Sequence, residues 1–354
     1  MKRRDFLSAT GVSVLSSAIA YGCSTKSSLP DSSQLVETPR KRGEYLERML
    51  KTLCTDIGPH SVGSPEFQIA AQIVKQEMEL ALPVVEFDPF TFERWVLKEE
   101  PELYVGDQKL EAFPGHGTSG TSPDGITGTL TRIDKNGIPY GLVDKSGEVI
   151  AYITKASYVR AVPLPYYSFK QEVKCFPTFN VGLDDIQVIE MALENKTPVR
   201  MKAMVEFIPD TETKNVVGTL PGESTDEILF LAHLDTVYNT QGANDNTASV
   251  IAMLMLAHSF SGVKPRKTLT FLATEGEEYN KLGAINYAER RKREGTYGNI
   301  KFLVNFDSIT WGSNMKIFTK DAELCSLIER IDRDLNIKGT PELIDSDGFA
   351  LDGK

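Results

Sequence analysis

The sequence predicts an α/β protein with a mixed central sheet flanked by helices and a β-rich unit inserted into it. The sheet is predicted from short apolar runs that have the length of buried strands and lack the 3.6-residue spacing of helices. These runs cover residues 228–232, 268–273 and 301–305. Each is followed closely by a histidine or a carboxylate. Open α/β sheets usually bind their ligands at the carboxyl edge of the strands, so that edge is the expected site.

The composition agrees with a large folded core. The chain has 354 residues, of which 41% are hydrophobic, enough for one large core or two modest ones. No apolar run approaches the length of a membrane-spanning helix. The net charge of −10 argues against nucleic acid as a partner. Cys54, Cys175 and Cys325 are too few and too scattered for a disulfide framework or a cysteine-based zinc site.

Residues 1–23 have the features of an export signal and are left out of the predicted fold. Arg3 and Arg4 stand before a short apolar stretch, a pattern typical of twin-arginine signals. The run Ala-Tyr-Gly-Cys that ends at Cys23 resembles a lipobox, which predicts a lipidated cysteine as the mature N-terminus. Cleavage after the Ala-x-Ala at 18–20 is the alternative. The protein is therefore expected in the periplasm or cell envelope, attached to a membrane only through this lipid.

A Ser/Pro-rich linker is predicted at 24–42, and the first part of the main domain at 43–97. In this part, apolar residues at helical spacing are interrupted by a Gly/Pro-rich stretch at 57–65. A second helix is predicted at 67–82, and a strand at 84–95 completes this part of the sheet.

The segment 98–210 has a different character and is predicted to be a separate inserted domain. It alternates short β-like runs with turns, among them 115–128 and 200–207, around one helix at 184–194. The second part of the main domain follows at 211–354.

Two helices are expected in that second part. One covers residues 248–258, and the other, at 321–335, has the amphipathic pattern of a covering helix.

His233 and Asp235 follow the first buried strand. On an extended chain the side chains of residues i and i+2 point the same way. The carboxylate of Asp235 is therefore expected to accept the second ring N–H of His233 and to fix the imidazole tautomer for metal binding.

Asp245 lies in a turn rich in glycine and asparagine, directly before the predicted helix at 248–258. Asn246 or Thr247 is the expected cap of that helix. A carboxylate held in this turn can reach two cations at once.

The remaining candidates follow the other two strands: Glu277 and Glu278 after the second, and Asp307 after the third. Imidazole and carboxylate ligands without a thiolate favour zinc, manganese or cobalt over a structural zinc-cysteine site.

Four motifs, in this order, resemble the M28 family of co-catalytic zinc aminopeptidases and carboxypeptidases. They are H-x-D at 233–235, G-x-N-D-N at 242–246, G-E-E at 276–278 and N-F-D at 305–307. The resemblance covers most of the chain from 43 onward and implies a zinc-exopeptidase-like fold. The inserted segment in turn resembles a protease-associated domain, abbreviated PA domain.

The resemblance also implies the metal ligands. Carried over position by position, His233 and Asp307 hold one zinc ion, Asp245 bridges two, and Glu278 holds the second. The family's closing S-D-H motif is S-D-G here, so Gly348 stands where the second zinc's histidine is expected. The second site is therefore expected to be incomplete.

Other residues are given different roles. Glu277 is implied as the general base that takes a proton from water. Glu275 is expected to be a bystander. His60 replaces the family's arginine in a Gly/Pro-rich stretch and is expected at a pocket rim or in solvent rather than on a metal. His258 is expected to be a surface residue or a residue at the C-terminal end of its helix that interacts with the helix dipole.

The implied function is that of an exported zinc-dependent metallopeptidase, an exopeptidase acting on peptides or small proteins. One alternative is a degenerate M28-like domain that binds peptides with little or no hydrolysis. It is motivated by Gly348 and by the end of the sequence at Lys354, where the family pattern continues. A single-zinc aminoacyl cyclase of the same superfamily is another alternative, but it also needs the missing histidine. The sequence leaves open the side-chain preference, the attacked end of the substrate and the oligomeric state.

Overall fold

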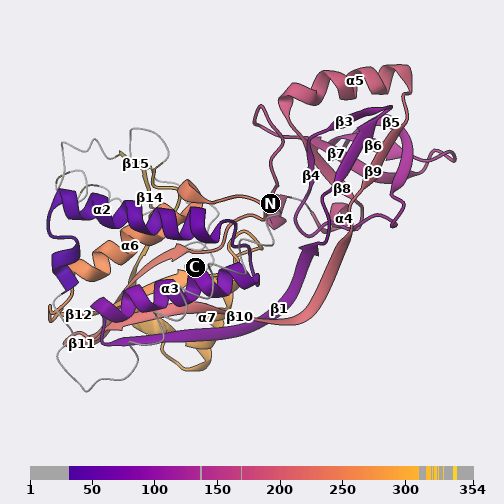
Figure 1. Cartoon of the computed structure of the whole chain (residues 1–354). Coiled ribbons are helices and arrows are strands. Elements are labelled where there is room, and N and C mark those ends of the chain that lie inside the picture. Colours follow the sequence, from indigo (N-terminus) through magenta and orange to yellow (C-terminus); the bar gives the residue numbers. More distant parts are fainter. Residues whose placement is uncertain are drawn as a thin grey trace.

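The computed structural model describes residues 32–310 apart from 136–137 and 169, together with a few positions between 316 and 340. Cys23 and Gly348 lie outside the described residues, as does most of the helix predicted at 321–335. Figure 1 shows a larger lobe, in which a sheet lies between helices, and a smaller β-rich lobe connected to it by two long strands. The described part contains no helix long and apolar enough to cross a membrane.

The larger lobe is built on a five-stranded mixed sheet with the strand order β1-β10-β12-β11-β13. Its strands are β1 (Val84–Leu97), β10 (Val205–Leu220), β11 (Ser224–His233), β12 (Lys267–Thr274) and β13 (Ile300–Asn305). β1 and β10 pair antiparallel, as do β10 and β12, whereas β11 lies parallel to both β12 and β13. The predicted fold class is confirmed.

Helices cover both faces of this sheet. On one face lie α2 (Pro39–Leu50), α3 (Pro65–Ala81) and α6 (Ala248–Ser259). On the other lies α7 (Leu282–Arg293). Side chains alternate along a strand, so Val216 packs toward the first set of helices while its neighbour Val217 packs toward α7.

Helices α2 and α3 each start after a residue whose side chain caps the helix. Thr38 accepts a hydrogen bond from the backbone N–H of Lys41, and Ser64 accepts one from Phe67. Each cap is followed by a proline, which fits the first turn because its missing N–H would have no partner there.

The predicted linker is too long. Ser32 and Val36 are buried and Val36 belongs to the main core, so the folded region starts within the segment 24–42. An apolar residue ahead of the Thr38 cap packs back onto the helices, which the Ser/Pro-rich composition of the segment concealed.

The smaller lobe holds an eight-stranded sheet with the order β3-β2-β9-β5-β6-β7-β8-β4. Its strands are β2 (Glu102–Val105), β3 (Gln108–Leu110), β4 (Ala112–Pro114), β5 (Ile126–Lys135), β6 (Ile138–Val143), β7 (Val149–Lys155), β8 (Thr178–Val181) and β9 (Val199–Lys202). Helix α5 (Ile186–Asn195) packs on it through Ile189 and Ala192.

Two predicted β-runs differ from the structure in this lobe. Most of 115–128 is a loop, because β5 begins only at Ile126, and 200–207 is divided between β9 and β10. The turn at 203–204 is where the chain leaves the small lobe for the main sheet. A local pattern does not reveal that change of sheet.

The remaining elements are short. They are the helix α4 (Gln171–Lys174), the strands β14 (Lys316–Phe318) and β15 (Lys338–Thr340), a π-helical turn at Lys51–Ile57, another at Ala243–Thr247, and 3₁₀ turns at Ser32–Leu35, Tyr166–Ser168, Leu183–Asp185 and Tyr297–Asn299.

Candidate metal centre

The candidate site lies where parallel strands of the main sheet end. His233 is the last residue of β11, the Glu277 and Glu278 pair follows β12, and Asp307 follows β13. β11 is the middle strand of these three, so its last side chain lies between those of its neighbours. Sheet topology therefore gathers residues that are far apart in the sequence.

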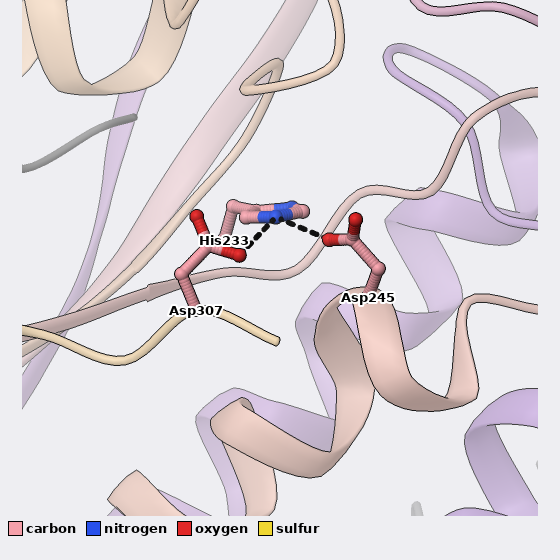
Figure 2. A group of neighbouring side chains, drawn as sticks. All are labelled: His233, Asp245 and Asp307. Carbon is pink, nitrogen blue, oxygen red and sulfur yellow. Dashed lines mark hydrogen bonds and ion pairs between the residues drawn. The ribbon is translucent and has the colours of Figure 1, made fainter. Parts of the chain in front are cut away.

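His233 lies between two carboxylates, as Figure 2 shows. Its Nε2 atom is 3.1 Å from Oδ1 of Asp245 and 3.9 Å from Oδ1 of Asp307. One potential ligand atom from each of the three residues lies within 4.8 Å of the other two. This spacing suits a single cation coordinated by all three.

A second group shares the same histidine. His233, Glu277 and Glu278 also bring one potential ligand atom each within 4.8 Å of one another. All three side chains are buried. The two groups together surround His233 with four carboxylates at one end of the sheet.

The other ring nitrogen of His233 has a different partner from the predicted one. Nδ1 lies 3.1 Å from the backbone carbonyl oxygen of Asp235 and 3.7 Å from its carboxylate. When Nδ1 donates its proton to that carbonyl, Nε2 is the atom free to bind a metal. The tautomer is thus fixed by the backbone of Asp235, not by its carboxylate as the i, i+2 argument predicted.

The carboxylate of Asp235 instead holds the Glu277 and Glu278 pair. One of its oxygens accepts the backbone N–H of Glu277 at 3.1 Å, and the other accepts that of Glu278 at 3.2 Å. Asp235 is fully buried. It therefore orients the turn that carries both glutamates.

The charges at the centre are poorly balanced. For His233, burial disfavours the charged imidazole, yet the nearby carboxylates of Asp235 and Asp245 outweigh it and raise its pKa well above the usual range. For the carboxylates of Glu278 and Asp307, burial disfavours the charged form and so raises the pKa. The negative charge of Asp245 raises the pKa of each carboxylate further. Burial would also raise the pKa of Asp245, but its hydrogen bond with His233 prevails and lowers it. Glu277 and Glu278 are buried and Asp307 partly so, and a cluster with this excess of carboxylates is one that a divalent cation would stabilise.

The donor set fits zinc. Imidazole nitrogen and carboxylate oxygen are among its ordinary protein ligands, and catalytic zinc sites keep a position open beside three such ligands. Cys54 and Cys175 do not contribute: each is a free thiol, and neither belongs to the two groups of potential ligands.

Asn246 connects two of the candidate ligands. Thr247 precedes α6 and makes no side-chain cap hydrogen bond, and Asn246 does not cap the helix either. Its side-chain N–H donates to the carbonyl of Phe306 at 2.9 Å, and its Oδ1 accepts the backbone N–H of Ser308 at 3.1 Å. Thr247 occupies the predicted cap position without a side-chain cap hydrogen bond, and Asn246 has no cap role because the loop after β13 offers its amide two backbone partners.

Glu275 is no bystander. It is fully buried, and its carboxylate accepts backbone N–H groups from Gly63 at 2.6 Å and Lys214 at 3.2 Å. It thereby joins the turn before α3 to β10 and to the end of β12. Burial raises its pKa well above the usual range.

His60 was expected at a pocket rim or in solvent, and it is fully buried. Its Nδ1 lies 2.7 Å from the carbonyl of Gly58, and its backbone is hydrogen-bonded to Thr236. Burial lowers its pKa. His60 thus belongs to the packing beneath the H-x-D loop.

His258 is also buried rather than exposed. Its ring nitrogens lie 3.0 Å from the hydroxyl of Ser32 and 3.2 Å from that of Tyr45. Tyr45 in turn donates to Glu77 at 3.0 Å. This network fastens the start of the folded region, and its partners come from segments that a local pattern cannot link.

The small lobe touches the candidate site directly. The backbone N–H of Tyr166 donates to the carbonyl of Glu278 at 2.8 Å, and the hydroxyl of Tyr238 donates to the carbonyl of Pro114. Between these two contacts lies an aromatic cluster whose rings are 4.1–5.7 Å apart between centres. We call it the seam; its members are Phe92, Trp95, His116, Tyr166, Tyr238 and Tyr279. The sequence analysis missed the seam, since its residues are scattered along the chain.

A family model described as "Peptidase family M28" matches residues 215–348. Human carboxypeptidase Q is 23% identical over 327 residues, covering 80% of this chain and 68% of that protein. A probable lipoprotein aminopeptidase, LpqL of Mycobacterium tuberculosis, is 25% identical over 308 residues, covering 79% of this chain and 60% of that protein.

Solved structures show the same fold. BSAP, a zinc aminopeptidase from Bacillus subtilis, superimposes with a TM-score of 0.70 at 18% identity, over 88% of this chain and 82% of that chain. A peptidase M28 precursor from Shewanella amazonensis SB2B gives a TM-score of 0.70 at 16% identity, over 91% and 85%. The segment matched by the family model contains His233, Asp245, the two glutamates and Asp307.

Proposed function

The chain belongs to peptidase family M28, and from that premise we propose that it is a zinc-dependent exopeptidase acting on peptides or small proteins. One observation carries the proposal: a buried histidine, His233, belongs to two groups of potential metal ligands, one with Asp245 and Asp307 and the other with Glu277 and Glu278. Two of these four carboxylates, Glu277 and Glu278, are buried, and such a concentration of negative charge is costly unless cations are bound there.

Zinc would be held by His233, Asp245 and Asp307 at one position. At the other it would be held by Glu278, together with Asp245 as a shared ligand. When bound, zinc supplies a Lewis acid that polarises the scissile carbonyl and lowers the pKa of water. Asp245 has non-helical backbone angles within its turn, and its carboxylate is directed toward His233 (Figure 2).

Glu277 is the proposed general base. Its side chain is buried beside His233 and Glu278, and its backbone is held by Asp235. From there it takes a proton from the attacking water and returns it to the leaving amine. Asp235 contributes by keeping the Glu277 backbone fixed, so that the base does not have to be reoriented during the reaction.

The number of ions is part of the proposal. Glu278 and the shared Asp245 are the expected ligands of the second position, since Gly348 offers no side chain. We expect one tight and one weak metal, with hydrolysis dependent on added divalent cation. Calorimetric titration with zinc checks this expectation. Two sites of similar tight affinity would contradict it, and G348H should strengthen the weaker site alone.

Gly348 also motivates the rival function, a domain that binds peptides without hydrolysing them. Metal content measured by mass spectrometry separates the two functions. Bound zinc together with peptide hydrolysis supports the enzyme, whereas metal-free protein that still binds peptide supports the binding domain.

Replacement of Glu277 by glutamine tests the mechanism. E277Q keeps the size and the hydrogen-bonding capacity of the side chain but removes its basicity. We expect hydrolysis to fall by about 10²- to 10⁴-fold, the usual contribution of a general base, with zinc content unchanged. Turnover at the wild-type rate, with metal content confirmed, would assign the base to another residue.

Export is a further part of the proposal. The arginine pair at Arg3 and Arg4 and the run ending at Cys23 support a twin-arginine signal followed by lipid attachment. One relative, LpqL, is itself named a probable lipoprotein. The enzyme would then work in the cell envelope on peptides that reach it there.

A further inference from the structure

The side chain of Asn215 is fully buried on β10 and makes three hydrogen bonds. Its Oδ1 atom accepts the backbone N–H of Glu275 at 3.0 Å. Its amide nitrogen donates to the backbone carbonyl of Gly283 at 3.0 Å and to Oδ2 of Asp88 at 3.0 Å. An asparagine amide has two donor hydrogens, and this arrangement uses both of them.

Glu275 and Gly283 are the two ends of the turn that carries Glu277 and Glu278. Glu275 follows β12, and Gly283 is the second residue of α7. The two ends also contact each other, because the N–H of Gly283 donates to the carbonyl of Glu275 at 2.7 Å. Asn215 therefore closes the base of this turn, since one side chain binds the N–H at its start and the carbonyl at its end.

Gly283 lies so close to Asn215 that a side chain does not fit between them. A Cβ atom at this position would overlap Oδ1 of Asn215 and the carbonyl oxygen of Glu275, and it would lie 2.7 Å from the Glu275 nitrogen. Alanine ordinarily favours a helix more than glycine does. The glycine at this place in α7 is therefore explained by its contact with Asn215 and Glu275, not by helix formation.

Asp88 holds the amide of Asn215 in this orientation. It is buried and lies opposite Asn215 in the pairing of β1 with β10. Its other oxygen is 2.7 Å from Nε of Arg290, on α7. Rotation of the Asn215 amide by half a turn would bring its oxygen against the Asp88 carboxylate, so Asp88 selects which atom faces Glu275. The turn is thus attached through one side chain to the two strands that continue into the small lobe.

We propose that Asn215 is a positioning residue for Glu277, the proposed general base, and that it acts by holding the two ends of the turn together. This inference rests on the proposed peptidase function. A general base works only within hydrogen-bonding reach of the proton it takes, so a small displacement of its turn lowers the rate. Asp235 holds the middle of the same turn through the N–H groups of Glu277 and Glu278. Asn215 adds the attachment at its base.

N215D replaces the donating nitrogen by an oxygen at nearly constant size. The variant keeps an acceptor for Glu275 but cannot donate to Gly283. With the dipeptide Leu-Ala as substrate and zinc present, we expect kcat to fall about 10- to 100-fold, the usual effect of losing an orienting partner, while KM stays close to the wild-type value. N286D is the matched control, because Asn286 donates to the carbonyl of Leu282 at 2.9 Å, within α7. A wild-type kcat in N215D, or a rise in KM in place of the fall in kcat, would overturn the proposal.

G283A tests the same contact from the other partner. Its added methyl group would push Asn215 and Glu275 away, so we expect a similar fall in kcat even though alanine favours the helix. G43A is the control, because Gly43 also lies in a helix, α2, and a Cβ atom there meets none of the described residues within 4 Å. G43A should keep the wild-type kcat. The same result in G283A would contradict the proposed role.

A double variant separates positioning from folding. N215D alone places two carboxylates side by side, which should make unfolding in urea easier. In D88N/N215D the donor and the acceptor are exchanged, so the hydrogen bond between positions 88 and 215 is restored and the midpoint should move back toward that of the wild type. The contact with Gly283 remains lost, so kcat should stay low. Recovery of kcat together with stability would show that N215D acts through folding, and the positioning role would be wrong.

Hydrogen–deuterium exchange separates this proposal from the peptidase proposal, because it requires no hydrolysis. The amides of Glu275 and Gly283 should exchange slowly in the wild type and about tenfold faster in N215D, the effect of losing one hydrogen bond. If the wild type hydrolyses no peptide but shows this difference, the peptidase proposal fails while the attachment of the turn by Asn215 stands. If the wild type hydrolyses Leu-Ala and the turn exchanges equally in both proteins, the role of Asn215 is refuted and the peptidase proposal remains.

Discussion

The side-chain amide of Asn246 donates a hydrogen bond to the backbone carbonyl of Phe306 over 2.9 Å, and so joins the turn of one candidate metal ligand to the loop of another. The same amide accepts the N–H of Ser308, so its two contacts enclose Asp307. Its own neighbour along the chain is Asp245. One side chain thereby sets the separation of two carboxylates that face His233.

We expect N246D to weaken zinc binding by about 10- to 100-fold, the usual effect of removing a residue that orients a ligand. A carboxylate keeps the contact with Ser308 but cannot donate to Phe306, and it adds a negative charge to a cluster already rich in them. Calorimetric titration with zinc measures the change. N286D is the control, because Asn286 makes a similar hydrogen bond, 2.9 Å from the carbonyl of Leu282, within α7. Equal zinc affinity in N246D and the wild type would show that Asn246 does not orient the two carboxylates.

Asp235 accepts backbone hydrogen bonds with both carboxylate oxygens, one from Glu277 and one from Glu278, in the proposed catalytic turn. D235N leaves one acceptor oxygen, so either Glu277 or Glu278 must face an amide N–H. We expect unfolding to become easier by about 1–3 kcal/mol, the usual effect of an unsatisfied buried donor. We also expect kcat to fall by roughly 10- to 100-fold, as for other orienting partners.

Urea unfolding and steady-state kinetics test this pair of effects. The control is D144N, since Asp144 also accepts backbone N–H groups, from Ser146 and Glu148, but in an exposed turn of the small lobe. A D235N variant with wild-type kcat would show that the turn keeps its position without this carboxylate.

Glu77 should make the stability of the fold depend on pH under acidic conditions. Burial alone would raise its pKa, but the nearby His258 ring and hydrogen bonds from Arg48 prevail and lower it to about 2, from an ordinary value of 4.5. A lowered folded-state pKa means that the stabilisation is present above the unfolded pKa and is lost as the pH falls toward about 2. The shift corresponds to about 3 kcal/mol.

E77Q should therefore unfold more easily at neutral pH and lose less stability than the wild type between about pH 4.5 and 2. Urea unfolding at a series of pH values measures both effects. E79Q is the control, because the ion pair of Glu79 with Lys75 is exposed and contributes little. Parallel stability curves for E77Q and the wild type across the acid range would contradict the prediction.

Cys23 is the predicted lipid attachment point. Without its thiol no acyl chain can be added, so C23A should move the protein from the membrane fraction to the soluble fraction. Fractionation followed by immunoblotting measures the distribution, with C175A as the control because that cysteine is an exposed thiol within the small lobe. If the wild type is already wholly soluble, the lipobox reading fails.

The sequence carried enough information for the fold class and for the strand ends that hold the candidate ligands. Buried strands have a recognisable length and composition, and residues directly after them share one edge of the sheet. His233 and Asp307 could be assigned to that edge because each lies within two residues of a strand end.

The hydrogen-bond partners could not be predicted in the same way. Alternation correctly suggested that Asp235 and His233 lie close together, but the acceptor that each donor selects depends on the turn after β12, which arrives from elsewhere in the chain. The burial of His60 and His258 could not be predicted either, for the same reason. Their burial is produced by partners such as Tyr45 and Thr236 that no local window contains.

β1 and β10 remain paired from Val84 and Thr219 in the main sheet to Leu97 and Val205 at the small lobe, with one register shift (Figure 1). Two strands paired over this length form a rigid connection between the lobes, unlike the flexible linkers that join many inserted domains. The small lobe would then keep a fixed position beside the proposed catalytic turn. A lobe held in this way would admit the loose end of a peptide to the proposed site and exclude compact folded chains without any closing motion.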